Sequence, residues 1–515
     1  MPSHIKAFIV IMFLSTIVFA FAKGSACIVD DCSEFRRRRN LWFALTASAF
    51  LSYNFWIYVG LSTIFITYTL RKEAHKATLF LFLLFIIPPV SKVIPGLGGL
   101  NALFALSHIR LLSLLILFPV FLSMIGNKSN EKARKSIVDI IVIAIIILGF
   151  ILDLRYKTTT DSIRSAFYGF TDTYIPYYVI SRSFRTVSDF HRIFLYFTIA
   201  VGILSAIAII EHLASWLLFQ SLVNVLDLHS GLFKYSVRAS AIRATASTGH
   251  SIVLGYLITI AIGFVLFLKS KLHSKSVYLV LLFVLLAGSY STVSRGPWLG
   301  ILVLLIVFLL TGPYAIRKFL KWILLMSLFI PIVMTTQWGQ HFIDLLPYVG
   351  SVESKNIDYR EILFDKAVTV ITHHPLFGSG NFLEAPEMQE LLRIQGGGII
   401  DITNSYLGIA LQGGLVTLGL FLGCFLFIIL GIYRSMRSLP KDNAEIRLVG
   451  RVLIATILSM LFILITVSQI SVISIVNWSV AGMGVGYIRM VAELKRANKE
   501  NDFLSSRSKI SAQYF

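Results

Sequence analysis

Three arginines lie near the ends of apolar segments that the hydropathy pattern places on the outward side of a membrane. They are Arg243, Arg295 and Arg360. A guanidinium group binds phosphate oxygens through two hydrogen bonds and keeps its charge at any working pH. A single arginine at a membrane surface usually only snorkels or pairs with a headgroup. Positive charge is disfavoured on the outward side, so three arginines there instead predict a binding site for a lipid diphosphate.

Candidate acid and base groups cluster in the long polar segment between residues 337 and 415. Carboxylates and imidazoles placed near a sugar hydroxyl can take its proton during attack. Each candidate also has an ordinary structural explanation, as a surface side chain or as the N-cap of a helix. The candidates are Glu361, His373, His374, Asp401 and Asn404 in the polar segment, with Arg238 and His250 in the outer segment upstream of it.

A predicted helix presents two of these residues together. Apolar residues recur at helical spacing between Asp358 and Thr372, which predicts an amphipathic helix lying on the membrane helices. Arg360 and Glu361 would project from its first turn. Pro375 ends the helix, because proline disfavours the helical conformation in the residue before it. The apolar positions are Ile362, Leu363, Ala367, Val370 and Ile371.

The elements that must position these residues are membrane helices. The 515 residues are 56% hydrophobic and 14% charged, and the mean hydropathy is +0.80. A soluble protein could not keep that much apolar surface from water. Runs such as Ile137–Phe150 and Val452–Thr466 lie in windows that can cross a bilayer, which takes roughly 20 helical residues. We predict an all-α, polytopic integral membrane protein with roughly 12–14 transmembrane helices and one large extracytoplasmic loop containing short helices.

The charge distribution indicates which side of the membrane each loop faces. The net charge of +20 would suggest nucleic acid in a soluble protein. Here the cations sit in short loops and follow the positive-inside rule. We therefore expect the protein to interact with a lipid bilayer and not with nucleic acid. The segment Thr335–Asp401 holds nine acidic and four basic residues and is predicted to face away from the cytoplasm. The basic inner segments include Arg71–Lys76, Lys128–Lys135, Lys269–Lys275, Arg317–Lys321 and Arg434–Arg451.

The first 70 residues leave the topology open. Ala7–Phe21 is expected to be a retained membrane helix, because no convincing cleavage site follows it. Leu41–Leu70 is too long for one ordinary span and short for two. Cys27 and Cys32 flank a short loop and could form a disulfide if that loop is extracytoplasmic. No cysteine–histidine spacing suggests a metal site, so neither a metal nor another cofactor is expected.

Four short motifs, taken in their order and spacing, resemble the O-antigen ligase and polymerase superfamily of bacterial envelope glycan enzymes. The resemblance covers about Ala200 to Met436. It divides the chain into N-terminal transmembrane helices (1–199), a ligase-like core (200–435) that includes the outer loop 336–403, and C-terminal helices with a basic tail (436–515). The motifs are Arg243–His250 with Gly255, Thr292–Gly296, Arg360 with His374–Gly380, and Asn404–Leu407 with Gly413–Leu415.

The resemblance implies a glycosyltransferase of the bacterial inner membrane whose active loop is periplasmic. Its donor would be a glycan linked to undecaprenyl diphosphate, transferred with inversion and without a metal. Arg243, Arg295 and Arg360 would hold the diphosphate, and a base in the loop would activate the acceptor hydroxyl. Other membrane proteins of polysaccharide assembly would be candidate partners.

One departure from the family pattern bears on the reaction. Ligases commonly carry histidine directly before the asparagine of the closing motif, whereas this sequence has Thr403. A polymerase that joins exopolysaccharide or O-antigen repeat units therefore fits better than a ligase that transfers glycan to lipid A core. The family places its reactive group at this helix start, which favours Asp401 as the base. Neighbouring arginines would weaken a carboxylate but leave a histidine usable, which favours His374; we rank Asp401 first.

A glycolipid transporter or flippase is the alternative from another class. A transporter would carry ionisable residues near the middle of its spans. The apolar runs are poor in them, with Arg110, Asp139 and Glu211 as exceptions. Charge gathers at one outer face instead, which favours an enzyme.

Overall fold

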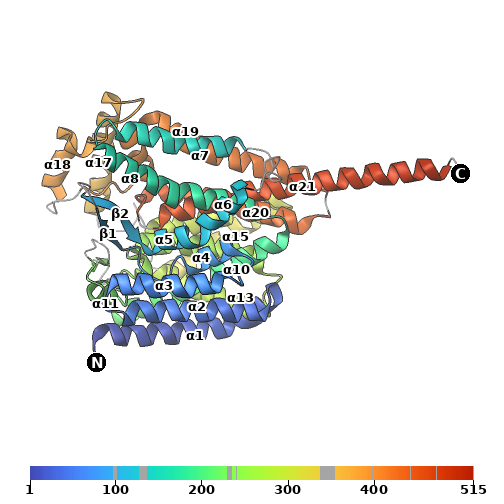
Figure 1. Cartoon of the computed structure of the whole chain (residues 1–515), viewed down its shortest axis with the longest axis horizontal. Coiled ribbons are helices and arrows are strands. Elements are labelled where there is room, and N and C mark those ends of the chain that lie inside the picture. Colours follow the sequence, from blue (N-terminus) through green and yellow to red (C-terminus); the bar gives the residue numbers. More distant parts are fainter. Residues whose placement is uncertain are drawn as a thin grey trace.

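The computed structural model is a bundle of helices that run between two ends of the molecule (Figure 1). At one end, here called the loop end, lie the N-terminus, α17 (Ser354–His373), α18 (Pro386–Gln395) and a β-hairpin. From the other, here called the basic end, projects the last part of α21 (Ile473–Gln513) (Figure 1). The structure describes residues 1–96, 101–126, 136–228, 233, 235–238, 241–336, 354–395, 400–440, 442–470 and 472–513.

The other elements follow in chain order. The first half holds α1 (Ser3–Val29), α2 (Cys32–Leu51), α3 (Phe55–Leu70), α4 (Lys76–Leu83), β1 (Ser91–Pro95), β2 (Ala102–Ser107), α5 (His108–Leu112), η1 (Ser113–Leu117), α6 (Phe118–Gly126), α7 (Ile137–Asp153), α8 (Thr159–Gly169), η3 (Phe170–Tyr174), α9 (Ile175–Arg182) and α10 (Val187–Ala214). The second half holds α11 (Gln220–Val225), β3 (Val237–Arg238), β4 (Ala241–Ile242), η4 (Ala246–Thr248), α12 (Ser251–Leu268), α13 (Lys275–Ser291), α14 (Arg295–Leu310), α15 (Ala315–Met334), η5 (Phe382–Glu384), α19 (Ser405–Arg437), α20 (Ala444–Ile463) and η6 (Leu464–Thr466).

The predicted all-α, polytopic membrane architecture is confirmed. Six of the described helical stretches are long and apolar enough to cross a membrane. One of them, His108–Gly126, is assembled from α5, the π-helical turn η1 and α6. Three shorter apolar helices are α3, α13 and α14. The only strands within the described ranges form two small antiparallel pairs, β1 with β2 and β3 with β4.

The ambiguous stretch Leu41–Leu70 contains the second half of α2 and the whole of α3. α2 ends at Leu51, and Tyr53 takes a positive φ of 51° in the turn that follows. The Asn54 side chain then accepts hydrogen bonds from the first backbone N–H groups of α3. Asparagine is among the preferred N-caps, so the short Ser-Tyr-Asn turn reverses the chain within three residues.

Helices α10 and α12 form the centre of the bundle. Their most apolar windows are 83% and 89% buried, whereas those of α1 and α19 are only 22% and 28% buried. α10 packs against α1, α4, α12 and α13, and α14 packs along α20. Small residues allow these helices to approach closely: a Cβ on Gly288 of α13 would lie 2.6 Å from Ser205 of α10. Close approach through small residues is the usual basis of helix packing in membranes.

The turn between α1 and α2 lies at the basic end. Asp30 in this turn pairs with Arg38 at 2.8 Å and with Arg192 at 3.3 Å. Cys27 and Cys32 are joined by a disulfide here, with their Cα atoms 4.7 Å apart. The sequence tied this pairing to an extracytoplasmic turn, but the turn lies at the end opposite the loop helices. The proximity arises from the tight helix–helix turn itself, whichever side of a membrane it faces.

Candidate active site

A cavity of about 690 Å³ opens at the loop end. It lies between the start of α14, the first turns of α17, the start of α19 and the turn η6. All the predicted site residues except His373 and His374 line it. The predicted residues in its wall are Arg238, Arg243, His250, Arg295, Arg360, Glu361, Asp401 and Asn404.

Two of the arginines hold the turn that presents a third. Arg238 Nη1 donates to the backbone oxygen of Val293 at 3.0 Å, and Arg243 Nη2 donates to Ser294 Oγ at 3.0 Å. Val293 takes a positive φ of 45°, which is rare for a β-branched residue and stores strain. The two guanidinium groups therefore fix a strained turn directly before Arg295, the first residue of α14.

Gly296 lets this start of α14 pack closely against η6. A Cβ on Gly296 would collide with the hydroxyl group of Thr466. Arg360 on α17 reaches the same turn, because its Nη2 donates to the Thr466 backbone oxygen at 3.5 Å. Arg295 and Arg360, about 65 residues apart in the chain, thus meet at one short turn after α20.

The amphipathic helix predicted over Asp358–Thr372 is confirmed as α17. Its apolar face packs against α18 and α19, and each buried side chain of this size contributes roughly 1.5–3 kcal/mol. The opposite face carries Glu361, which is exposed at the cavity. Tyr359 anchors the first turn by donating from its hydroxyl to the Asp401 backbone oxygen at 3.0 Å. The buried cluster is Tyr359, Leu363, Ala367, Val370, Met388, Leu391 and Leu411.

The His-Pro-Leu-Phe-Gly motif and the Gly-Gly pair of α19 form one joint. Gly414 has a φ of +71° and kinks α19. The Leu415 N–H freed by the kink donates to the Pro375 backbone oxygen at 2.8 Å. A Cβ on Gly414 would run into the Leu376 carbonyl, so only glycine permits this approach. The two motifs therefore fasten the end of α17 to a membrane helix.

His373 and His374 lie beyond this joint. They line a separate cavity of about 420 Å³ together with Asn381 and Glu384. The backbone oxygen of His374 accepts the Gly378 N–H at 3.0 Å, which places this histidine in the turn of the joint. The arrangement separates both histidines from the arginines and favours Asp401 over His374 as the base.

Asp401 stands at the mouth of α19 without capping it. Its Oδ1 accepts from the Ser468 hydroxyl at 3.2 Å. The cap is Asn404, whose side-chain oxygen accepts from the N–H groups of Tyr406 at 2.9 Å and Leu407 at 3.3 Å. Asn404 therefore has a structural task, while the exposed carboxylate of Asp401 remains available to the cavity.

His250 is a neutral hydrogen-bond donor in this arrangement. Its Nδ1 accepts the Ile252 N–H at 3.3 Å and caps α12, so the ring proton of the neutral form must sit on Nε2. Burial and the nearby Arg243 lower the pKa of His250 to about 4, and Asp401 opposes this only in part. A ring with this pKa and an occupied Nδ1 is a poor base at neutral pH.

Glu211, which the sequence marked only as a charge inside an apolar run, positions the segment that carries Arg243. Its side chain is fully buried near the end of α10. One carboxylate oxygen accepts the N–H of Leu218 at 3.0 Å. The other accepts those of Thr245 at 2.9 Å and Ala246 at 2.8 Å. The lone glutamate in an apolar helix was the available signal, but its partners are backbone groups that no motif reveals.

We expect Glu211→Gln to destabilise the protein and to lower its activity. Glutamine would turn an NH₂ group toward backbone donors and leave at least one buried N–H unsatisfied, at a cost of about 1–3 kcal/mol. A thermal-unfolding assay on the purified protein should show a lower midpoint temperature. The exposed Glu493→Gln on α21 is the control and should behave as the parent chain. Equal midpoints for the two variants would contradict this role of Glu211.

Within the described residues, no three His, Cys, Asp or Glu side chains gather as metal ligands. The cavity instead carries arginines, a carboxylate at a helix mouth and a neutral histidine, a set that can bind phosphate oxygens and accept a proton.

Residues 279–422 match the protein family described as O-antigen ligase. The matched stretch contains Arg295, Arg360, Glu361 and Asp401, while Arg243 and His250 lie just before it. No curated protein matches the chain. The matched stretch, residues 279–422, supplies the starts of α14 and α19 and the first turns of α17 to the arginine-lined cavity, and this part of the chain is similar to the O-antigen ligase family.

Proposed function

We propose that the protein is a polysaccharide polymerase that joins undecaprenyl-diphosphate-linked repeat units at the periplasmic face of the bacterial inner membrane. The observation that carries the proposal is the convergence of four arginines and two carboxylates on one cavity at the loop end. Arg243, Arg295 and Arg360 bind the donor diphosphate. Asp401 is the base that receives the acceptor proton, and Glu361 is a second carboxylate that lines the same cavity.

In the proposed reaction, an acceptor hydroxyl attacks the anomeric carbon of the donor glycan opposite the diphosphate. A new C–O bond forms, the bond to the diphosphate oxygen breaks, and its electron pair leaves with the diphosphate. The hydroxyl proton passes to Asp401, and the single displacement inverts the configuration. Prepositioned arginines stabilise the charge that grows on the leaving group, and one such donor contributes about 3 kcal/mol.

The residue at position 403 favours polymerisation over ligation. Thr403 lines the cavity at the place where ligases commonly have histidine. A threonine hydroxyl does not act as a base near neutral pH, so this position cannot supply the base that a histidine would supply in a ligase. The alternative function is an O-antigen ligase that transfers the glycan to lipid A core.

The ionisable residues within the spans argue against a glycolipid transporter. Arg110 pairs with Asp172 at 2.9 Å, Asp139 pairs with Arg489 at 2.8 Å, and Glu211 accepts backbone N–H groups. Each is already held by groups of the protein itself, whereas a transport path needs ionisable groups that can contact a substrate near the bilayer midplane.

The glycan left in a deletion strain tests the proposal. A strain without the polymerase should accumulate single lipid-linked repeat units. Long chains that are not attached to lipid A core would instead identify a ligase. Unchanged polymer with repeat units held on the cytoplasmic side would point to a flippase.

We expect the loop end to face away from the cytoplasm, because the described part of the acidic loop, 354–395, lies at the end opposite the described basic segments. A cysteine introduced as Gln389→Cys, at an exposed position of α18, should react with a membrane-impermeant thiol reagent in intact spheroplasts. Ser438→Cys, exposed after α19 at the basic end, is the control and should react only after lysis. The reverse pattern would overturn both the topology and the proposed periplasmic reaction.

A further inference from the structure

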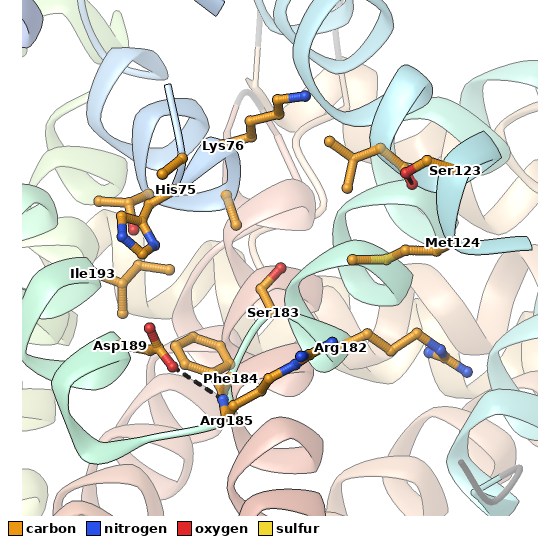
Figure 2. A pocket seen from close by; sticks show the side chains of 14 residues that line it. His75, Lys76, Ser123, Met124, Arg182, Ser183, Phe184, Arg185, Asp189 and Ile193 are labelled. Carbon is orange, nitrogen blue, oxygen red and sulfur yellow. Dashed lines mark hydrogen bonds between the residues drawn. The ribbon is translucent and has the colours of Figure 1, made fainter. Parts of the chain in front are cut away.

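A second polar cavity lies at the basic end, far from the arginine-lined site along the helices. It has a volume of about 310 Å³ and lies between the start of α4, the end of α6 and the elbow that joins α9 to α10. Figure 2 shows side chains from all three elements around it. The residues labelled there are His75 and Lys76, Ser123 and Met124, and Arg182, Ser183, Phe184, Arg185, Asp189 and Ile193.

Two cations of this cavity have no carboxylate partner among the residues that the structure describes. Lys76 and Arg185 come from different elements and both line the cavity. Across the described residues, no Asp or Glu lies within salt-bridge distance of the Lys76 ammonium or the Arg185 guanidinium group. Two unneutralised cations facing one small cavity favour a ligand with negative charge.

The nearby acids are already engaged by other groups. Asp189 accepts the N–H groups of Arg185 at 3.0 Å and Thr186 at 2.9 Å, and its other oxygen pairs with Arg192 at 3.1 Å. The dashed line in Figure 2 marks the contact between Arg185 and Asp189. Asp139, the partner of Arg182, is shared with a second arginine on α21. The cavity therefore keeps a positive balance.

The start of α4 adds neutral donors to the same wall. No side chain caps this helix, and residues 74–78 all line the cavity. His75 Nδ1 lies 3.4 Å from Arg192 Nη1 and accepts from it, so the neutral ring carries its proton on Nε2. Burial and then Arg192 lower the pKa of His75, which keeps the ring neutral at physiological pH. Cations and N–H donors together suit the oxygens of a phosphate group.

We propose that this cavity binds the phosphate headgroup of an anionic phospholipid from the leaflet at the basic end. The neighbouring surface of α6 selects a lipid over a soluble phosphate. Leu122 and Ile125 flank the cavity residues Ser123 and Met124, and each is 52% exposed. Such apolar side chains on a membrane helix face acyl chains, so a headgroup can enter while its tails stay in the bilayer. Basic pockets between helices are a known setting for anionic headgroups.

Binding of phosphatidylglycerol to the full-length purified protein tests the proposal. A fluorescent phosphatidylglycerol is titrated against the parent chain and against the double variant Lys76→Gln/Arg185→Gln. The control double variant is Lys72→Gln/Arg36→Gln, which removes the same charge from exposed residues at the same end but outside the cavity. At about a fivefold effect for each basic residue, the cavity variant should bind roughly 10- to 30-fold more weakly. The control should change less than about twofold.

The outcomes separate the sources of the phosphate. Fluorescent phosphatidylcholine should bind weakly to all the proteins, and millimolar inorganic phosphate should not displace phosphatidylglycerol. Equal losses in both double variants would show that only the general charge of the basic end attracts the lipid, and would overturn the site. Displacement by inorganic phosphate would assign the cavity to a soluble anion instead. An unchanged melting profile for each variant excludes unfolding as the cause, and no readout depends on the proposed glycosyl transfer.

Discussion

Arg295→Ala is expected to lower polymer formation by at least about 100-fold without unfolding the protein. Removing one preorganised donor to a developing negative charge typically costs a factor of about 100 to 1,000 in rate. Arg295 begins α14 directly after the turn that Arg238 and Arg243 hold through hydrogen bonds to Val293 and Ser294. The turn should survive the substitution, because those bonds do not use the Arg295 side chain.

Arg295→Lys separates charge from geometry. Lysine keeps the positive charge but cannot supply the bidentate fork, so this variant should also lose most activity. Polymer formed from purified lipid-linked repeat units, normalised to folded protein, is the measurement. Arg71→Ala, exposed after α3 at the basic end, is the matched control and should retain full activity. Near-normal polymer from Arg295→Lys would show that charge alone suffices.

Asp401→Asn is expected to abolish polymer formation while donor binding remains intact. Loss of a positioned base costs about 100- to 10,000-fold in rate. Asparagine can still accept the Ser468 hydroxyl, and the backbone oxygen at position 401 still accepts from Tyr359, so the local structure should persist. Binding of the lipid-linked donor and polymer yield should therefore respond differently.

Two further variants test whether another residue is the base. His374→Ala should be mild, because His374 lines the other cavity. Glu361→Gln removes the second carboxylate of the arginine-lined cavity and should also be milder than Asp401→Asn. If Asp401→Asn makes polymer of normal length and amount while Glu361→Gln does not, the base lies on α17 instead of at the mouth of α19.

The residue types and patterns of the sequence predicted the convergence of the arginines, but not how it is achieved. Arg243, Arg295 and Arg360 were recognisable because cations are disfavoured on the outward side, and α17 was recognisable from its apolar period. Electrostatics favoured His374 as a base beside these arginines, whereas chain position favoured Asp401. His374 instead lines another cavity, next to the turn that is fastened to the kink at Gly414, and a positive φ at one glycine inside an apolar helix leaves no periodic signal.

The contacts that support the cavity could not be predicted from the sequence either. Glu211 binds backbone N–H groups, and Gly296 matters through the Thr466 side chain, about 170 residues away. Neither partner is distinguishable by residue type. For the disulfide, the short spacing of Cys27 and Cys32 predicted the pairing, but the sequence did not predict at which end of the molecule the disulfide lies.

The joint between Pro375–Gly378 and the kink of α19 sets a rule for exchanging parts between related proteins. Because Leu415 and Val416 donate to the backbone oxygens of Pro375 and Leu376, the two segments fit only as a pair. A chimaera that imports the polar loop of a relative must import residues 411–416 with it. A graft that ends at residue 395 would join a foreign loop to the native kink of α19. The backbone contacts between the two segments would then be mismatched, and α17 would be misaligned with Arg243 and Arg295.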